Sequence, residues 1–373
     1  MDRRTFLSLA AVGTAAGEPR ADLPKYRIVS KFQPAPGSSG MPGKYPATVV
    51  RVRGAQSIDT ATNRINQQVV REMLAKGMRG LTGASDDRDA WRAFITPEDV
   101  VGIKVNCSGA PGIMSSPEVV SEIIRSLNGI GVPAGQIWIY ERFPDQMQTV
   151  NYGKYVPEGV HIDGIEKSRM SIAGYDPATY VEVDFFGEDD TRSMLVRHVS
   201  QRFTKIINVP NMKDHGAAGV TGCLKNIAYG NFSNVARSHH SSKTNTLSFI
   251  GTLASVEPLR SKTVLQVMDG LRGVWHGGPF LHVDRFRFYP KQIMIGTDPV
   301  AIDRLLLDVI EDKRKQEHAI SVWDRSEQTL HRGFERDPNA NNFVREPGHI
   351  EFAAKLGLGT YDIAKIQKTT IDV

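Results

Sequence analysis

The feature that most constrains this fold is an apolar run that is followed along the chain by a capped helix and then by a second apolar run. Residues 100–106 read Val-Val-Gly-Ile-Lys-Val-Asn, a nearly continuous apolar run typical of a strand buried on both faces. Ser116 and Pro117 are typical of a helix cap and first turn, and we expect this helix to end near Gly129. Residues 136–140 form the next predicted strand. This order predicts a parallel sheet with right-handed crossovers.

Other apolar and amphipathic segments extend the pattern along the chain. Further strands are predicted at residues 47–52, 205–209, 263–268 and 292–295. Further helices are predicted at residues 63–81, 86–95, 222–229, 241–253, 300–310, 317–322 and 350–356. Residues 142–199 show no clear period, and we expect loops and edge strands there. The prediction is an α/β protein with mostly parallel sheets flanked by helices.

The chain length and its local composition predict the domain organisation. A chain of 373 residues suggests one large domain or two lobes with a cleft between them. We expect a first α/β lobe at residues 47–210 and a second at residues 211–373. Residues 18–46 are rich in proline and glycine, which predicts a linker or an extended arm.

The overall composition excludes several classes of protein. Hydrophobic residues make up 40% and charged residues 23% of the chain, as in globular proteins. The net charge of +5 is dispersed, so no nucleic-acid partner is predicted, whereas an anionic small molecule remains open. The two cysteines, Cys107 and Cys223, are too few for an iron–sulfur cluster or a four-thiolate zinc site. Whether they form a disulfide is left open.

The first 17 residues have the anatomy of a twin-arginine export signal. Arg3 and Arg4 precede a short apolar stretch at residues 6–16, which ends in small residues. This stretch is well short of the ~20 residues that span a bilayer, and no membrane span is expected in the mature chain. The alternative is an amphipathic N-terminal helix. The signal predicts a periplasmic or otherwise exported protein that engages the twin-arginine machinery, a route that often carries folded proteins with a cofactor.

The segment from Asn208 to Asn231 is the strongest candidate for a functional site. It begins at the carboxyl end of a predicted strand and continues into an expected polar loop with Lys213, Asp214 and His215. Three glycines and the predicted helix at residues 222–229 follow. In open α/β sheets, ligands lie beyond the carboxyl ends of the strands. The segment therefore predicts a ligand site.

Individual residues of this segment have distinct predicted roles. His215 and Lys213 are the predicted catalytic residues, with His215 as the proton carrier. Gly219 and Gly222 would let the backbone approach the substrate, and the helix N-terminus would favour an anion. Lys225 would add positive charge. The alternative is a tight strand-to-helix turn with solvated side chains, since the glycine spacing matches neither the dinucleotide fingerprint nor the phosphate-binding loop.

Residues outside the loop are predicted to join it. Lys104 and Asn106 end an otherwise apolar strand, and with Asn226 they are predicted to bind substrate beside Lys225. A lysine in such a strand either extends its head group to solvent or faces a ligand.

Two further residues, His239 and Asp269, are candidate metal ligands. His239 belongs to a polar cluster for which a surface turn is the alternative, and Asp269 ends a predicted strand. His276 is a weaker site candidate. Asp298 is predicted to cap the helix that follows it.

A series of short motifs follows one order along the chain. They are Ile103–Asn106, Pro210–His215, Thr221–Asn226, Met268–Gly270, Gly277–Pro279 and Gly296–Asp303. The series resembles the family called domain of unknown function 362, and its Lys-x-His and Leu-Lys-Asn pieces are the most specific. Some members of that family carry ferredoxin-type cysteine clusters, which two cysteines cannot supply. The layout is also similar to the nickel-dependent lactate racemase group, which implies a metal ion or a nickel-containing cofactor.

These observations lead to one main hypothesis and two alternatives. The main hypothesis is an exported enzyme, of isomerase or oxidoreductase type, that acts on an anionic small molecule with histidine and lysine chemistry. The first alternative is a periplasmic protein that binds an anion or cofactor without catalysis. The second is a scaffold or maturation factor that uses residues 142–199 as a docking surface.

Overall fold

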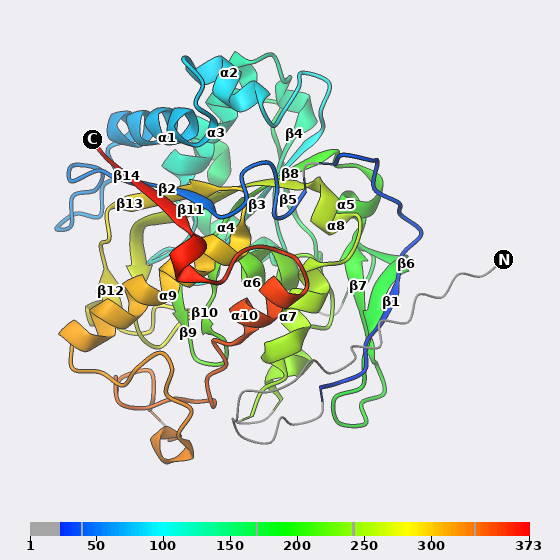
Figure 1. The fold of residues 1–373 in the computed structure, drawn as a ribbon, viewed down its shortest axis with the longest axis vertical. Coiled ribbons are helices and arrows are strands. Elements are labelled where there is room, and N and C mark those ends of the chain that lie inside the picture. The colour runs from blue at the N-terminus through cyan, green and yellow to red at the C-terminus, as the bar shows by residue number, and fades with distance from the viewer. Residues whose placement is uncertain (1–22, 39, 169–170, 241–242, 332) are drawn as a thin grey trace.

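A large, mostly parallel sheet runs through the middle of the computed structural model, which describes residues 23–38, 40–168, 171–240, 243–331 and 333–373 (Figure 1). Within those residues the sheet has 11 strands, eight of them in the order β14-β2-β13-β11-β8-β3-β4-β5. The pairs from β11 to β5 are all parallel, whereas β13 is antiparallel to both of its neighbours. The predicted α/β class with a mostly parallel sheet is therefore confirmed.

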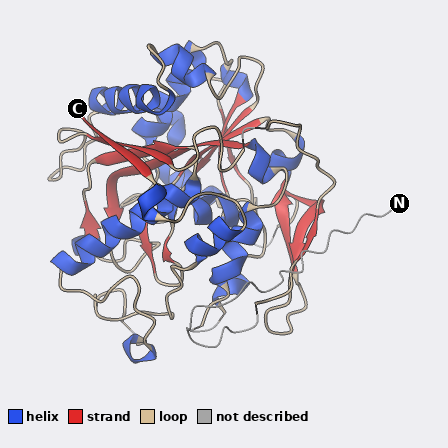
Figure 2. Cartoon of the chain, viewed as in Figure 1, coloured by secondary structure: helices blue, strands red, loops and turns tan. Residues whose placement is uncertain are grey.

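The strands and helices alternate along much of the chain (Figure 2). The strands are β1 Arg27–Val29, β2 Thr48–Arg53, β3 Val101–Val105, β4 Ile137–Glu141, β5 His161–Gly164, β6 Tyr175–Glu182, β7 Arg192–Val196, β8 Lys205–Val209, β9 Asn211–His215, β10 Gly219–Val220, β11 Thr263–Val274, β12 Arg287–Phe288, β13 Gln292–Gly296 and β14 Gln367–Asp372. The α-helices are α1 Gln67–Thr82, α2 Asp87–Arg92, α3 Pro117–Gly129, α4 Pro144–Val150, α5 Arg197–Gln201, α6 Gly222–Tyr229, α7 Thr246–Ala254, α8 Leu259–Lys262, α9 Pro299–Gln316 and α10 His349–Lys355.

Helices cover both faces of the sheet (Figure 1). Apolar side chains of α1, α2 and α3 pack in one core cluster, and those of α6, α7, α9 and α10 pack in a second. A separate three-stranded sheet, in the order β1-β6-β7, lies beside the second group. The architecture therefore has three layers, as expected for a parallel sheet.

The alternation of side chains along the strands places one polar row on the α6 face. Val101, Ile103 and Val105 of β3 belong to the core with α1 and α3, so Lys104 points to the other face. The register aligns Lys104 with Asn208 of β8. These polar residues, at the carboxyl ends of parallel strands, lie where ligands bind in such folds.

Most predicted elements agree with the structure, but two predictions are wrong. Residues 211–215, expected as a polar loop, form the fully buried strand β9. Asn211, Lys213 and Asp214 find partners from distant segments, which allows their burial. The helix expected at residues 317–322 is absent from the described residues, since α9 ends at Gln316 and the chain turns back. Val322 N–H donates to the Glu311 carboxylate at 2.8 Å, and Arg314 donates to the carbonyl of Ile320 at 2.5 Å.

The ends of the chain refine the predicted organisation. Residues 18–46, expected as a linker or arm, contain β1, which pairs with β6. The predicted export signal at residues 1–17 lies outside the described residues. The sheet takes strands from both sides of residue 210, since β2 lies between β13 and β14, and the division into two lobes stays a prediction.

Three further observations concern the helices and the cysteines. Among the described helices, none has both the length and the apolar character needed to cross a membrane. Cys107 and Cys223 are buried and free. Asp298 caps α9, as predicted, by accepting a hydrogen bond from Ala301 N–H at 2.8 Å.

Candidate functional site

Three asparagines and two lysines form a continuous hydrogen-bond network, named here the asparagine network, beneath α6. Asn226 of α6 donates to Asn208 Oδ1 at 2.7 Å, and Asn226 Oδ1 accepts from Asn106 at 3.1 Å and from Lys104 at 3.4 Å. Asn106 Oδ1 in turn accepts from Lys213 Nζ at 2.6 Å. The structure therefore brings together four predicted site residues, Lys104, Asn106, Lys213 and Asn226, from three segments of the chain.

The two lysines of the asparagine network have different partners. Lys104 forms a buried ion pair with Glu141, whose carboxylate lies 2.9 Å from Nζ. Lys213 donates to the amide oxygen of Asn106 and to the carbonyl of Ser108, both uncharged. Burial lowers the pKa of Lys213 to about 7. Sequence reasoning missed Glu141, although it directly follows the predicted strand at residues 136–140.

The close approach of α6 to the sheet depends on a glycine at position 230. A Cβ atom there would lie 2.1 Å from Lys104 Cε and 2.4 Å from its Nζ. At the next residue, Asn231, the side-chain Oδ1 accepts a hydrogen bond from Tyr140 at 3.0 Å. These contacts fix α6 against β3 and β4.

The N-terminus of α6, predicted to favour an anion, already holds a carboxylate of the protein. Asp303 of α9 accepts from Cys223 N–H at 2.5 Å and from Leu224 N–H at 2.9 Å. Gly222 has a φ of 60°, and a Cβ atom there would lie 2.4 Å from that carboxylate. At Gly219, with a φ of 78°, a Cβ atom would lie 2.9 Å from Pro347. Both glycines therefore face protein atoms, which the glycine pattern alone could not reveal.

A fully paired group of charges, named here the Asp214 cluster, lies on one side of β9. It consists of Asp214, Arg314, Arg345 and His276. Asp214 Oδ1 accepts from Arg345 at 2.5 Å and from Arg314 at 3.4 Å, and Oδ2 accepts from a backbone N–H. Burial opposes the charge of Asp214, but the two arginines hold its pKa below the ordinary value. His276 hydrogen-bonds to Arg314 and to the carbonyl of Phe334, so this site candidate has a structural role.

A second group, named here the Lys225 cluster, consists of Lys225, His215, His239 and His349. The ring centroids of His215 and His239 are 5.4 Å apart, and Lys225 Nζ lies 4.3 Å from the centroid of the Tyr229 ring. Among the described residues, Lys225 Nζ has no hydrogen-bond or ion-pair partner. Lys225 and His239 are half-buried, whereas His215 and His349 are buried. The cluster is therefore open to solvent on the side of Lys225 and His239.

Hydrogen bonds define the proton position on His215. Its Nδ1 accepts from the N–H groups of Ala217 at 3.1 Å and Ala218 at 3.3 Å, which places the ring proton on Nε2. Nε2 has no partner among the residues described, so its N–H is free to donate to a ligand.

The other two imidazoles each carry an unpartnered nitrogen. Nε2 of His239 and Nε2 of His349 are buried without hydrogen-bond partners. Nδ1 of His349 lies 3.0 Å from the carbonyl of Glu346, which places its proton on Nδ1 and leaves Nε2 as an acceptor. Buried orphan atoms of this kind are rare in folded proteins and require an explanation.

Burial and mutual repulsion keep the Lys225 cluster weakly charged. Burial first, and then Arg142 and Lys213, lowers the pKa of Lys225 to about 7. Burial and then Lys225 lower the pKa of His239 to about 3, and burial holds the pKa of His215 well below its ordinary value. At neutral pH the histidines are therefore neutral, and Lys225 is divided between its two protonation states.

The two predicted metal ligands, His239 and Asp269, have different neighbours. Both carboxylate oxygens of Asp269 accept backbone N–H groups, from Ser116 at 2.7 Å and Leu271 at 3.0 Å, and burial raises its pKa. In the part of the chain that the structure describes, no group of three or more histidine, cysteine, aspartate or glutamate residues could hold a metal ion. The assignment of a metal to His239 and Asp269 stays a prediction.

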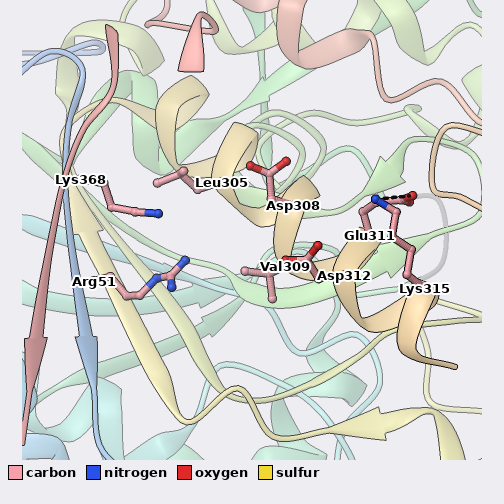
Figure 3. Close-up of a pocket in the computed structure, with 8 residues that line it drawn as sticks. All are labelled: Arg51, Leu305, Asp308, Val309, Glu311, Asp312, Lys315 and Lys368. Atoms are coloured by element: carbon pink, nitrogen blue, oxygen red, sulfur yellow. Dashed lines mark ion pairs between the residues drawn. The ribbon is translucent and has the colours of Figure 1, made fainter. Parts of the chain in front are cut away.

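A surface hollow of about 440 Å³ lies elsewhere, between α9 and the paired strands β2 and β14 (Figure 3). Arg51 and Lys368 point from the strands toward Asp308 and Asp312 of α9. No predicted site residue lines it. The hollow carries charges of both signs, whereas the predicted catalytic residues Lys213 and His215 lie in the asparagine network and in the Lys225 cluster.

Comparison with known proteins identifies one family. The family model described as domain of unknown function (DUF362) matches residues 101–308. All ten predicted site residues lie within that range, whereas Arg314, Arg345 and His349 lie beyond it. No curated protein matches the sequence. The match covers more than half of the chain, and the chain belongs to the DUF362 family.

Proposed function

We propose that this chain is an exported enzyme of isomerase or oxidoreductase type that acts on a small anionic molecule at the Lys225 cluster. One observation carries the proposal: Lys225 Nζ has no acceptor among the described residues, and it lies beside a buried imidazole with a free N–H. A half-buried ammonium without an acceptor is costly, and a ligand that supplies the acceptor relieves that cost.

The arrangement gives each residue of the cluster a chemical task. The ammonium form of Lys225 attracts an anion, and its amine form accepts a proton at neutral pH. His215 donates from Nε2 to an oxygen of the substrate and stabilises negative charge that develops there. Lys213, predicted as catalytic, is held by Asn106 and Ser108, and its task is to support the positive field.

The proposal includes export of the protein to the periplasm and the binding of a metal ion or a nickel-containing cofactor. Arg3 and Arg4 support passage through the twin-arginine machinery to the periplasm, where the enzyme would act. Replacing both arginines by lysine in the full-length chain should keep the protein in the cytoplasm. Cell fractionation checks this expectation, and unchanged export would contradict the twin-arginine route. Elemental analysis and mass spectrometry of the gently purified exported protein test for a metal ion or a nickel-containing cofactor.

A non-catalytic binding protein is the second candidate. It is favoured by the asparagine network, in which both lysines already have partners, so that few groups are free for chemistry. Such a protein would use Lys225 and the N–H of His215 only to hold the anion.

Calorimetry with lactate and with phosphate tests the shared part of both candidates. Lys225→Met should weaken binding about 10-fold to 100-fold, because it removes a hydrogen bond to a charged group. Lys355→Met is the matched control, since Lys355 is an exposed lysine paired with Glu351 on α10. Equal affinity in the Lys225→Met variant would exclude the Lys225 cluster as the site.

Proton exchange in deuterium oxide separates the two candidates. An enzyme that removes a proton next to the carboxylate of lactate should incorporate deuterium there, observed by nuclear magnetic resonance. A binding protein would bind the anion and leave the carbon–hydrogen bond intact.

A further inference from the structure

The three lysines around β9 and α6 differ in what their amino groups contact. Lys104 Nζ lies 2.9 Å from the Glu141 carboxylate and 2.6 Å from the carbonyl of Val105. Lys213 Nζ donates to two oxygen atoms. Lys225 Nζ has only the face of the Tyr229 ring, 4.3 Å from its centroid, and no oxygen or nitrogen partner in the described chain. Lys225 is therefore the only one of these three lysines whose lone pair, once deprotonated, is free to react.

The surroundings of Lys225 favour its neutral form. Arg142 and Lys213 place positive charge near it, and the neighbouring imidazoles of His215 and His239 are uncharged at neutral pH. Neighbouring cations activate a lysine as a nucleophile, since they favour the free amine. The same cations attract a carboxylate carried by the substrate.

The site is better suited to a carbonyl group than to an anion alone. A strong anion site gathers several N–H donors, but the N-terminal N–H groups of α6 already donate to Asp303. What remains is one free amine and the free N–H of His215. An amine that can attack carbon, next to an N–H that can bind the carbonyl oxygen, suits an aldehyde or a ketone.

We propose that Lys225 forms a Schiff base with the carbonyl carbon of a small oxo acid. This inference rests on the proposed function and deepens it by naming the substrate class and the covalent step. In the step, the lone pair of Nζ forms a carbon–nitrogen bond while the carbon–oxygen π bond breaks. Both amine hydrogens end on the former carbonyl oxygen, which leaves as water, and no oxidant or reductant is consumed. His215 Nε2 stabilises the developing oxyanion.

Trapping with sodium cyanoborohydride tests the proposal on the full folded chain. The protein is incubated with pyruvate or glyoxylate and the reductant, and adducts are located by intact mass and peptide mapping. We expect one reduced adduct per chain, on Lys225, with faster labelling at pH 8 than at pH 6, because the free amine is required. Lys225→Met should lose this adduct, whereas Lys355→Met should keep it.

The possible outcomes separate the inference from the proposed function. Labelling of Lys225 that lactate slows by competition would support both. No adduct on Lys225, or labelling spread evenly over surface lysines, would overturn the Schiff base. If lactate binding still depends on Lys225 in that case, the proposed function stands without the covalent step. If lactate does not bind either, both fail.

Discussion

The Asp214 cluster and the Lys225 cluster each include one of two adjacent residues of β9, Asp214 and His215. The charged groups of the first cluster are paired, whereas Lys225 in the second has no ion-pair partner among the described residues. Side chains of neighbouring residues in a strand point to opposite faces, so Asp214 and His215 face different surroundings. Asp214 accepts from two buried arginines. On the other face, the Nε2 atoms of His239 and His349 are buried without protein partners among the residues described here.

The difference indicates which cluster holds the fold together and which is prepared for a ligand. A buried charge is tolerated when it is paired and hydrogen-bonded, as in the Asp214 cluster. Titratable groups with strongly shifted pKa values and no pairing are more typical of functional sites. The C-terminal segment serves both, since Arg345 reaches Asp214 and His349 belongs to the Lys225 cluster. Replacement of Asp214 and replacement of Lys225 should therefore have opposite effects on stability.

Asp214→Asn should have the largest effect on stability. The variant leaves the buried guanidinium groups of Arg314 and Arg345 without a charge partner, which should lower the free energy of unfolding by about 3–5 kcal/mol. Urea denaturation measures this loss. Asp87→Asn, which breaks the exposed pair with Arg79, is the control and should cost less than about 1 kcal/mol. A similar small loss for Asp214→Asn would remove the distinction between the clusters.

Lys213→Met should have the next largest effect, about 2 kcal/mol of destabilisation, because Asn106 Oδ1 and the Ser108 carbonyl lose their donor. This residue shares with Lys225 a pKa of about 7. Its loss should be destabilising nevertheless, because its ammonium is hydrogen-bonded. Urea denaturation at pH 7 checks this expectation, and a stabilised variant would contradict the importance of hydrogen bonding.

The sequence predicted the part of the site that follows from strand order. Lys104, Asn106 and Lys213 follow or end predicted parallel strands, and such ends meet at one edge of a sheet. Their gathering with Asn226 could therefore be expected without coordinates. The strands at residues 100–106 and 205–209 were recognisable because burial on both faces leaves an apolar run.

The parts of the site that the sequence did not predict depend on contacts between residues far apart in the chain. Asp303 reaches the N-terminus of α6 from 80 positions further along the chain than Cys223, and no local pattern signals this contact. The same holds for Arg345, which lies 131 positions from Asp214. The sequence of β9 resembles a loop because Asn211, Lys213 and Asp214 are satisfied by such remote partners. Periodicity reports local burial and cannot identify them.

Two replacements of His215 should distinguish the structural role of Nδ1 from the ligand-binding role of Nε2. His215→Ala leaves the N–H groups of Ala217 and Ala218 without an acceptor and should cost about 1–2 kcal/mol. His215→Asn should cost less, because an asparagine oxygen can accept from the N–H two residues on. Thermal unfolding compares the two variants, and lactate binding should weaken in both. Retained binding in the asparagine variant would show that the N–H of Nε2 is not used.

Lys225→Met should have the smallest effect on stability and the opposite sign. In the unfolded chain this lysine keeps its proton up to about pH 10.5, whereas in the folded chain it loses it at about pH 7. Between these values the unfolded state binds more protons, so the stability of the unsubstituted protein rises with pH in that window and is lowest below pH 7. The methionine variant should therefore be more stable at pH 6 by about 1 kcal/mol, a value reduced for partial exposure, and the difference should shrink toward pH 10. Urea denaturation from pH 6 to pH 10 measures the two curves. Parallel curves would mean that the folded protein does not disfavour the ammonium of Lys225, and the contrast between the two sides of β9 would then rest on the Asp214 cluster alone.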